Sequence, residues 1–122
     1  MDPYQLPEPL RARMAELEAR SSLEKVRSLL LGHVADADSL DEVRSLLKMT
    51  AAHTTTYLRQ DLDAIDEILT EPLPPNTLLH LVAGEAGWPL DDNPTDAGAS
   101  RFLRDLANMI REVIDEAEHR NI

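Results

Sequence analysis

The sequence predicts an all-α fold, a single-domain bundle of about five helices with one long central helix. The apolar residues are mainly leucine, 20 in number, and alanine, while the chain has only one tryptophan, two tyrosines and one phenylalanine. Leucine and alanine favour helices, whereas aromatic and β-branched residues favour strands. Apolar residues also recur every three or four positions through most of the chain, which places them on one face of a helix. A length of 122 residues suits one buried core, so we expect residues 1–122 to form one domain.

The first part of the chain is expected to hold an extended lead-in and two helices. Residues 1–9 contain three prolines, which cannot donate a backbone hydrogen bond, and these residues therefore form the lead-in. A first amphipathic helix begins at Leu10. Ser21 and Glu24 have the spacing of a capping box, in which the serine oxygen accepts from a first-turn amide and the glutamate reaches back. A second helix starts there, with an apolar stripe of Leu23, Val26, Leu30 and Val34.

The longest periodic run follows Ser39, which forms a second capping box with Glu42. Its spacing predicts one long helix over residues 40–70. The β-branched residues 54–56 mark either a bend in this helix or a fresh start. The run ends at a proline turn, residues 71–76, because proline cannot donate and disfavours helix in the residue before it. The stripe consists of Leu40, Val43, Leu47, Thr50, Thr54, Leu58, Leu62, Ile65 and Leu69.

Two more helices are predicted after the proline turn. Asn76 or Thr77 can cap a short apolar helix that ends at Gly84 or Gly87. Residues 84–95 are expected to form an acidic, turn-rich loop. Thr95 and Asp96 then suit the start of the last helix, since a carboxylate is favourable at the positive end of the helix dipole. The buried face of that helix is expected to hold Phe102, Leu103, Leu106, Met109, Ile110, Val113, Ile114 and Ala117.

Charge is strongly segregated along the chain. Residues 60–100 contain nine carboxylates and no lysine or arginine, and they supply nine of the eleven net negative charges. Such a field repels the phosphates of nucleic acids and the headgroups of anionic membranes, so we expect neither as a partner. A basic protein surface or a metal ion suits it better. The nine carboxylates are Asp61, Asp63, Asp66, Glu67, Glu71, Glu85, Asp91, Asp92 and Asp96.

Several classes of protein and site are not expected. The chain has no cysteine, which excludes disulfides, thiolate zinc sites and a cysteine nucleophile. No basic segment followed by an apolar core begins the sequence, and no run of about 18 apolar residues occurs, so we expect a cytoplasmic protein. Among the four histidines, only His119 follows a glutamate by three positions, whereas a di-iron bundle needs two such pairs. We therefore predict no metal site, no cofactor and no catalytic residue.

The carboxylates of the long periodic run are the main candidate site. Asp63, Asp66, Glu67 and Glu71 lie three or four positions apart, and each like-charged pair destabilises a helix by roughly 0.2–0.5 kcal/mol. One interpretation is a solvated face that aids solubility. The other is a docking surface for a basic protein, with Trp88 as an apolar anchor, although this tryptophan could instead plug the edge of the core. The predicted partner-binding residues are Asp61, Asp63, Asp66, Glu67, Glu71, Trp88, Asp91 and Asp92.

Two other functions remain open. Glu112 and Asp115, if they face Asp63 and Asp66, would resemble the paired acidic motifs with which all-α nucleotide pyrophosphohydrolases hold magnesium. The sequence departs from that pattern, because the first motif of those proteins is rich in glutamate and the phosphate needs basic residues that this region lacks. The third possibility is a structural protein that forms a homodimer through the wide apolar face of the last helix.

Residues 54–70 (TTTYLRQDLDAIDEILT), the proline turn and residues 78–82 (LLHLV) resemble the small helical immunity proteins of bacterial contact-dependent inhibition systems. The resemblance implies a protein that binds one cognate toxin domain and blocks it without catalysis. Many such toxins are cationic nucleases, for which an acidic partner is physically suitable. The candidate residues given above come from the charge distribution and not from this family.

Overall fold

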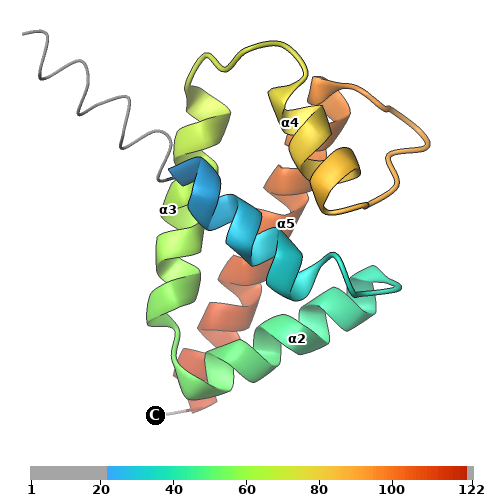
Figure 1. Ribbon diagram of the computed structural model, residues 1–122. Coiled ribbons are helices and arrows are strands. Elements are labelled where there is room, and N and C mark those ends of the chain that lie inside the picture. The colour runs from blue at the N-terminus through green and yellow to red at the C-terminus, as the bar shows by residue number, and fades with distance from the viewer. Residues whose placement is uncertain (1–21, 121–122) are drawn as a thin grey trace, which may run out of the picture.

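The computed structural model of the protein describes residues 22–120, and its regular elements there are all helical (Figure 1). The prediction of an all-α bundle is therefore confirmed. The predicted lead-in and the helix from Leu10 lie outside the described residues. The described elements are a helix over 22–33, α2 (Leu40–His53), α3 (Thr56–Thr70), α4 (Thr77–Leu79), the π-helical segment η2 (His80–Glu85) and α5 (Asp96–Arg120).

The prediction of one long helix over residues 40–70 is wrong, because α2 and α3 are separate. Thr54 is extended, with φ −162° and ψ 143°, and its hydroxyl oxygen accepts a hydrogen bond from the backbone N–H of Thr56 at 3.1 Å. A threonine side chain that binds the nearby backbone in this way offers an alternative to the helical hydrogen bond. The chain turns at this break, so that α2 runs at a steep angle to α3 (Figure 1). The long helix of the bundle is α5, with 25 residues.

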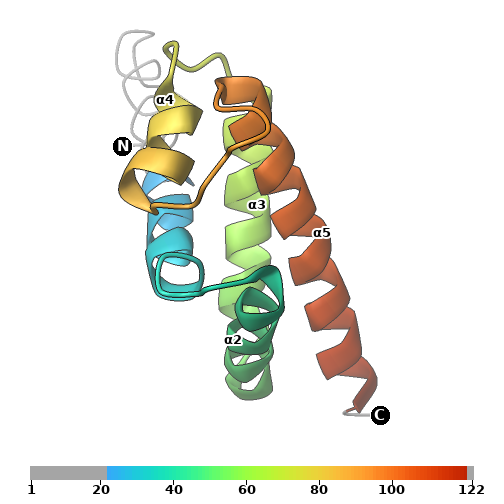
Figure 2. The ribbon, with the colours of Figure 1, turned by 90° about the vertical axis from the view of Figure 1, so that its right-hand side faces the viewer.

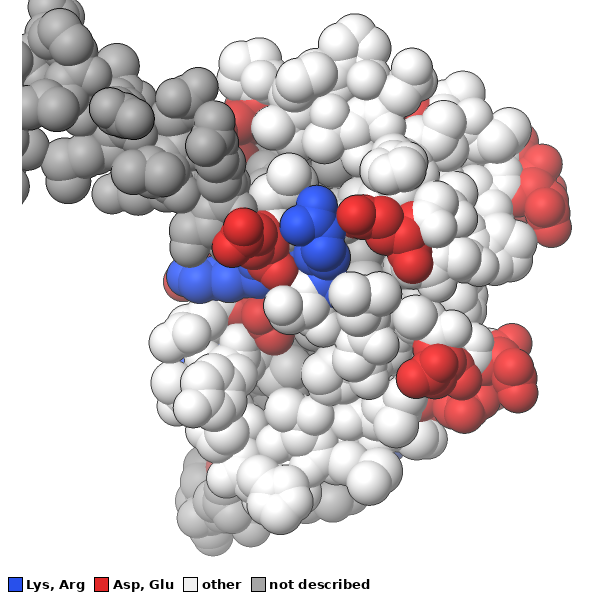
Figure 3. Space-filling view, viewed as in Figure 1, with Lys and Arg blue, Asp and Glu red and all other residues white. Residues whose placement is uncertain are grey.

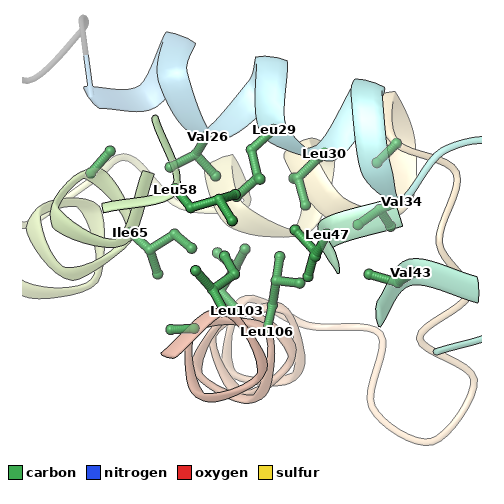
Figure 4. Close-up of a cluster of buried hydrophobic side chains, with 14 of the residues drawn as sticks. Val26, Leu29, Leu30, Val34, Val43, Leu47, Leu58, Ile65, Leu103 and Leu106 are labelled. Carbon is green, nitrogen blue, oxygen red and sulfur yellow. The ribbon is translucent and has the colours of Figure 1, made fainter. Parts of the chain in front are cut away.

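The core forms around α5, which packs against α2, α3 and α4. Figure 2 shows α5 running along one side of the bundle, with α4 and η2 lying over the helix at 22–33. Leu103 and Leu106 of α5 meet Leu47 of α2 and Ile65 of α3 in the interior (Figure 4). Full burial of such a side chain stabilises the fold by roughly 1.5–3 kcal/mol. The periodic stripes predict most of these positions correctly, and the largest fully buried residues are Val26, Leu30, Val34, Val43, Leu47, Leu58, Ile65, Val82, Leu103, Leu106, Ile110 and Val113.

The short helix after the proline turn extends past Gly84, the first of its two predicted stops. It continues through η2 to Glu85, so the loop spans residues 86–95 and not 84–95. Gly87 follows with φ +67°, the left-handed conformation that glycine adopts without strain after a helix end. The backbone N–H of Trp88 then donates to the carbonyl of Val82 at 3.0 Å. Gly87 therefore ends this helix, as one of the two predicted stops.

Asp96 joins the beginning of α4 to the beginning of α5. Its two carboxylate oxygens accept hydrogen bonds from the backbone N–H groups of Asn76 at 2.6 Å and Leu79 at 3.0 Å. Asn76 has φ +69°, a left-handed conformation that asparagine tolerates better than most residues. The prediction that the last helix starts at Thr95 and Asp96 is confirmed, and Asp96 in addition caps a helix that lies 17 to 20 residues earlier in the chain.

Candidate functional site

The acidic residues of α3 do not form one uniform exposed strip. Glu67 is half-buried and accepts a hydrogen bond from the Ser22 hydroxyl at 2.5 Å. Asp66 is exposed and pairs with Arg111 of α5 at 3.4 Å. Asp63 and Glu71 are exposed, and no partner contacts their carboxylates among the residues that the structure describes. Two of the predicted partner-binding carboxylates, Asp66 and Glu67, thus bind other side chains of the same protein.

Asp61 is half-buried, and burial raises the pKa of its carboxyl above the ordinary value for aspartate. The charges of His33 and Lys25 act in the opposite direction but do not cancel this effect. The folded protein therefore binds the Asp61 proton more tightly than the unfolded chain does. The stabilisation that this gives is complete below the ordinary aspartate pKa and is lost as the pH rises through the raised pKa.

Replacing Asp61 by asparagine is consequently expected to raise the melting temperature at neutral pH, because a neutral side chain avoids the cost of burying the charge. The gain should shrink to near zero at about pH 3, where the aspartate itself is mostly protonated. Thermal unfolding of both proteins at the two pH values measures the difference. The matched control is Asp63→Asn, two positions away and exposed, which should change the melting temperature little. A lower melting temperature of Asp61→Asn at neutral pH would contradict the expectation.

Trp88, the predicted apolar anchor, packs within the protein. Its ring centroid lies 5.4 Å from that of Phe102 on α5, with an angle of 31° between the ring planes. It is half-buried and contacts the hydrophobic core. Aromatic pairs at such a centroid distance contribute roughly 0.5–1.5 kcal/mol beyond the area that they bury. The tryptophan therefore fixes the base of the 86–95 loop against α5, as the interpretation of a core plug predicts.

A hollow of about 360 Å³ lies between the 86–95 loop and the first turns of α5. Asp91 and Asp92 line it from the loop, and Asp105 lines it from the helix. All three carboxylates are exposed, and no ion pair or hydrogen bond is formed by them within residues 22–119. Against these charges the lining contains one guanidinium and an apolar wall. The remaining lining residues are Pro89, Leu90, Asn93, Gly98, Arg101 and Phe102.

Gly98 allows the loop to approach α5 closely enough to form this hollow. A Cβ atom at Gly98 would lie 1.8 Å from the carbonyl oxygen of Asn93, far inside van der Waals contact. Asn93 in turn accepts a hydrogen bond from the Thr95 hydroxyl at 2.6 Å, and that hydroxyl oxygen accepts one from the Gly98 N–H at 3.2 Å. Thr95 thus caps α5 and ties the loop to it.

Several lining residues of the hollow were not predicted as a site, namely Leu90, Gly98, Arg101 and Asp105. The one available signal was Gly98 itself. Glycine is unfavourable inside a helix by about 0.8–1.0 kcal/mol relative to alanine, so its presence indicates a packing reason. Without the fold, nothing in the sequence identifies the segment that packs there.

The acidic loop and the acidic residues of α3 lie on opposite sides of the bundle (Figure 1). They therefore cannot form one continuous surface, although they belong to one block of the sequence. The loop instead shares an edge of the molecule with a second acidic group, from the turn before α2 and the start of that helix. Figure 3 shows both groups as red clusters at one edge, separated by uncharged surface. The exposed residues of the second group are Asp36, Asp38, Asp41 and Glu42.

Two of the four carboxylates of the alternative magnesium site form ion pairs within the protein. Glu112 pairs with Arg44 of α2 at 2.8 Å, and Asp66 pairs with Arg111. Within residues 22–119, no group of three histidine, aspartate or glutamate side chains is arranged so that it could hold a metal ion. The apolar face of α5, through which a homodimer would form, is largely occupied by the core of the chain itself, since Leu103, Ile110 and Val113 are buried there.

In the described part of the chain, no helix is both long and apolar enough to cross a membrane. Comparison of the chain with protein-family models, with curated proteins and with solved structures gave no match.

Proposed function

We propose that this protein is a non-catalytic binding module that docks the hollow beside the 86–95 loop onto a basic protein. In this proposal the partner is a cognate toxin domain, as the resemblance of residues 54–82 to immunity proteins implies, and binding takes place in the cytoplasm. The observation that carries the proposal is the combination of three carboxylates that have no partner within residues 22–119, Asp91, Asp92 and Asp105, with an apolar wall around one hollow.

The chemistry of the hollow suits a lysine or arginine side chain of the partner. The aliphatic part of such a side chain would pack against Leu90 and Phe102, while its charged end would meet the carboxylates of Asp91 and Asp92. Arg101 reduces the negative charge of the hollow but does not balance it. The second acidic group at the same edge, residues 36–42, extends the field over a larger surface and would steer a basic partner toward it.

Two charge-reversal variants test which acidic surface binds the partner. The first is Asp91→Lys with Asp92→Lys in the loop. The second is Asp63→Lys on α3 with Glu71→Lys directly after it, which makes the same change in charge on the opposite side of the bundle. All four positions are exposed, so both variants should fold, which circular dichroism and thermal unfolding verify.

The wild type, used as bait in lysate of the native organism, is expected to capture a basic protein that moderately high salt partly releases. Mass spectrometry identifies this protein, and calorimetry with the purified pair measures its affinity. The loop variant should bind it roughly tenfold or more weakly, because two attractive contacts become repulsive, whereas the α3 variant should bind nearly normally. Loss of binding in the α3 variant alone would contradict the proposed surface. Capture of no basic protein by the wild type would contradict the proposed function.

A further inference from the structure

A second groove, of about 410 Å³, lies between α3 and α5. The sequence predicts an acidic surface at α3, but the lining of this groove has more positive than negative charge. It holds two arginines, Arg104 and Arg111, and one carboxylate, Asp66. In a chain with a net charge of −11, a groove with a local excess of positive charge is unusual and is not needed for solubility. The other lining residues are Leu69, Thr70, Ala107 and Asn108.

Arg104, Asn108 and Arg111 lie on one face of α5, at positions i, i+4 and i+7. Asn108 and Asp66 both hold the Arg111 guanidinium, since Nη1 donates to Asn108 Oδ1 at 2.9 Å and Nη2 donates to Asp66 Oδ1 at 3.4 Å. These two bonds orient Arg111 and leave further N–H groups of its guanidinium available. They also use the amide oxygen of Asn108, and the amide nitrogen of that residue has no acceptor within residues 22–119.

Arg104 forms no hydrogen bond or ion pair within the described residues 22–119. It is exposed and lines the groove two helical turns before Arg111, roughly 10 Å away along the axis. Arginines in surface positions of this protein otherwise commonly pair across helices, as Arg44 does with Glu112 and Arg59 does with Glu118. The groove therefore presents an unused guanidinium, an oriented guanidinium and an amide donor along one wall.

We propose that this groove binds a phosphate group through Arg104, Asn108 and Arg111. Guanidinium groups bind phosphate through paired N–H donors, and a phosphate offers more acceptor oxygens than a carboxylate to donors spread along a helix. A phosphate with two negative charges also attracts the Arg111 guanidinium more strongly than the single negative charge of Asp66 does. Leu69 and Ala107, which line the same groove, give an apolar surface on which the organic part of a phosphate monoester would lie. This site is on a different part of the molecule from the hollow proposed for docking and does not depend on it.

The test is a nuclear magnetic resonance titration of the full chain with inorganic phosphate and, separately, with phenyl phosphate, using sodium chloride at equal ionic strength as reference. Saturable shifts are expected at the backbone amides of residues 104–111 and 66–70. The variant Arg104→Gln should weaken binding about fivefold or more, because it removes a charge-assisted donor. The variant Asp66→Asn should strengthen binding several-fold, because it removes the competing negative charge and frees Arg111.

Arg101→Gln is the matched control, since it removes the same charge from the same helix at a residue that lines the other hollow. It should leave phosphate binding nearly unchanged. Equal affinity for the two probes would assign the site to free phosphate, and tighter binding of phenyl phosphate would assign it to a monoester, so either result supports the proposal. Shifts that do not saturate beyond the chloride reference would overturn it. Equal weakening in Arg101→Gln and Arg104→Gln would do the same, because it would show a response to net charge alone.

Discussion

Replacing Gly98 by alanine is expected to lower the free energy of unfolding by roughly 1–3 kcal/mol, the usual cost of inserting a methyl group into a packed site. The value should lie at the upper end of that range, because the added Cβ would be 1.8 Å from the carbonyl oxygen of Asn93. That oxygen belongs to the backbone, so the clash cannot be relieved by a change of side-chain rotamer. The loop would have to move away from α5, which would also open the hollow proposed for docking.

Urea denaturation of Gly98→Ala measures this cost, and Gly32→Ala is the control. Gly32 lies in the helix over 22–33, and an added Cβ there would meet nothing within 4 Å. The same substitution should therefore stabilise the protein at Gly32, by about 0.5–1 kcal/mol, because alanine has the higher helix propensity. Opposite signs at the two glycines are the expected result. Stabilisation at both would show that the loop does not rest against Gly98.

Replacing Asp96 by alanine is expected to cost about 1–3 kcal/mol, because it leaves the backbone N–H groups of Asn76 and Leu79 without their acceptors. Leu79 is partly buried, so water can replace the lost acceptor there less well than at the exposed Asn76. The loss of stability should affect the start of α4 in particular, in addition to the fold as a whole. Amide hydrogen exchange at Leu79 should accelerate more than the change in overall stability accounts for, since the start of α4 frays once its cap is removed.

The variant Asp96→Asn separates the hydrogen bonds from the charge. Asparagine keeps an oxygen acceptor but loses the negative charge and one of the two oxygens, so its cost should be smaller than that of Asp96→Ala. Asp92→Ala provides the baseline for an exposed carboxylate without a partner in the described residues and should change stability by less than about 0.5 kcal/mol. If Asp96→Ala behaved like Asp92→Ala, the cap would not contribute to the fold in solution.

The helical class and most of the core were predictable, because both depend on a local period. Val26, Leu30 and Val34 recur at four-residue spacing and are buried together, since that spacing places them on one helix face whatever they pack against. The break at Thr54 was not predictable in the same way. The apolar stripe continues across it to Leu58, so the period is the same for one helix and for two.

The residues predicted as a docking site do not share one surface, because neighbours in the sequence need not be neighbours in space. Asp91 and Asp92 lie together at an exposed hollow, as a docking surface requires. Asp66 and Glu67, by contrast, contact Arg111 and Ser22, each 45 residues away in the sequence. No local pattern specifies such partners.

The all-helical class, the buried stripes, the start of the last helix and the excess of negative charge follow from residue type and short-range spacing alone. Which charges are exposed depends on how the helices pack. This packing brings Arg111 beside Asp66, presses the Asn93 carbonyl against Gly98, and places the acidic loop on the opposite side of the bundle from α3. Ion pairs and close packing depend on distances in space, and these distances are set by how the helices pack around α5.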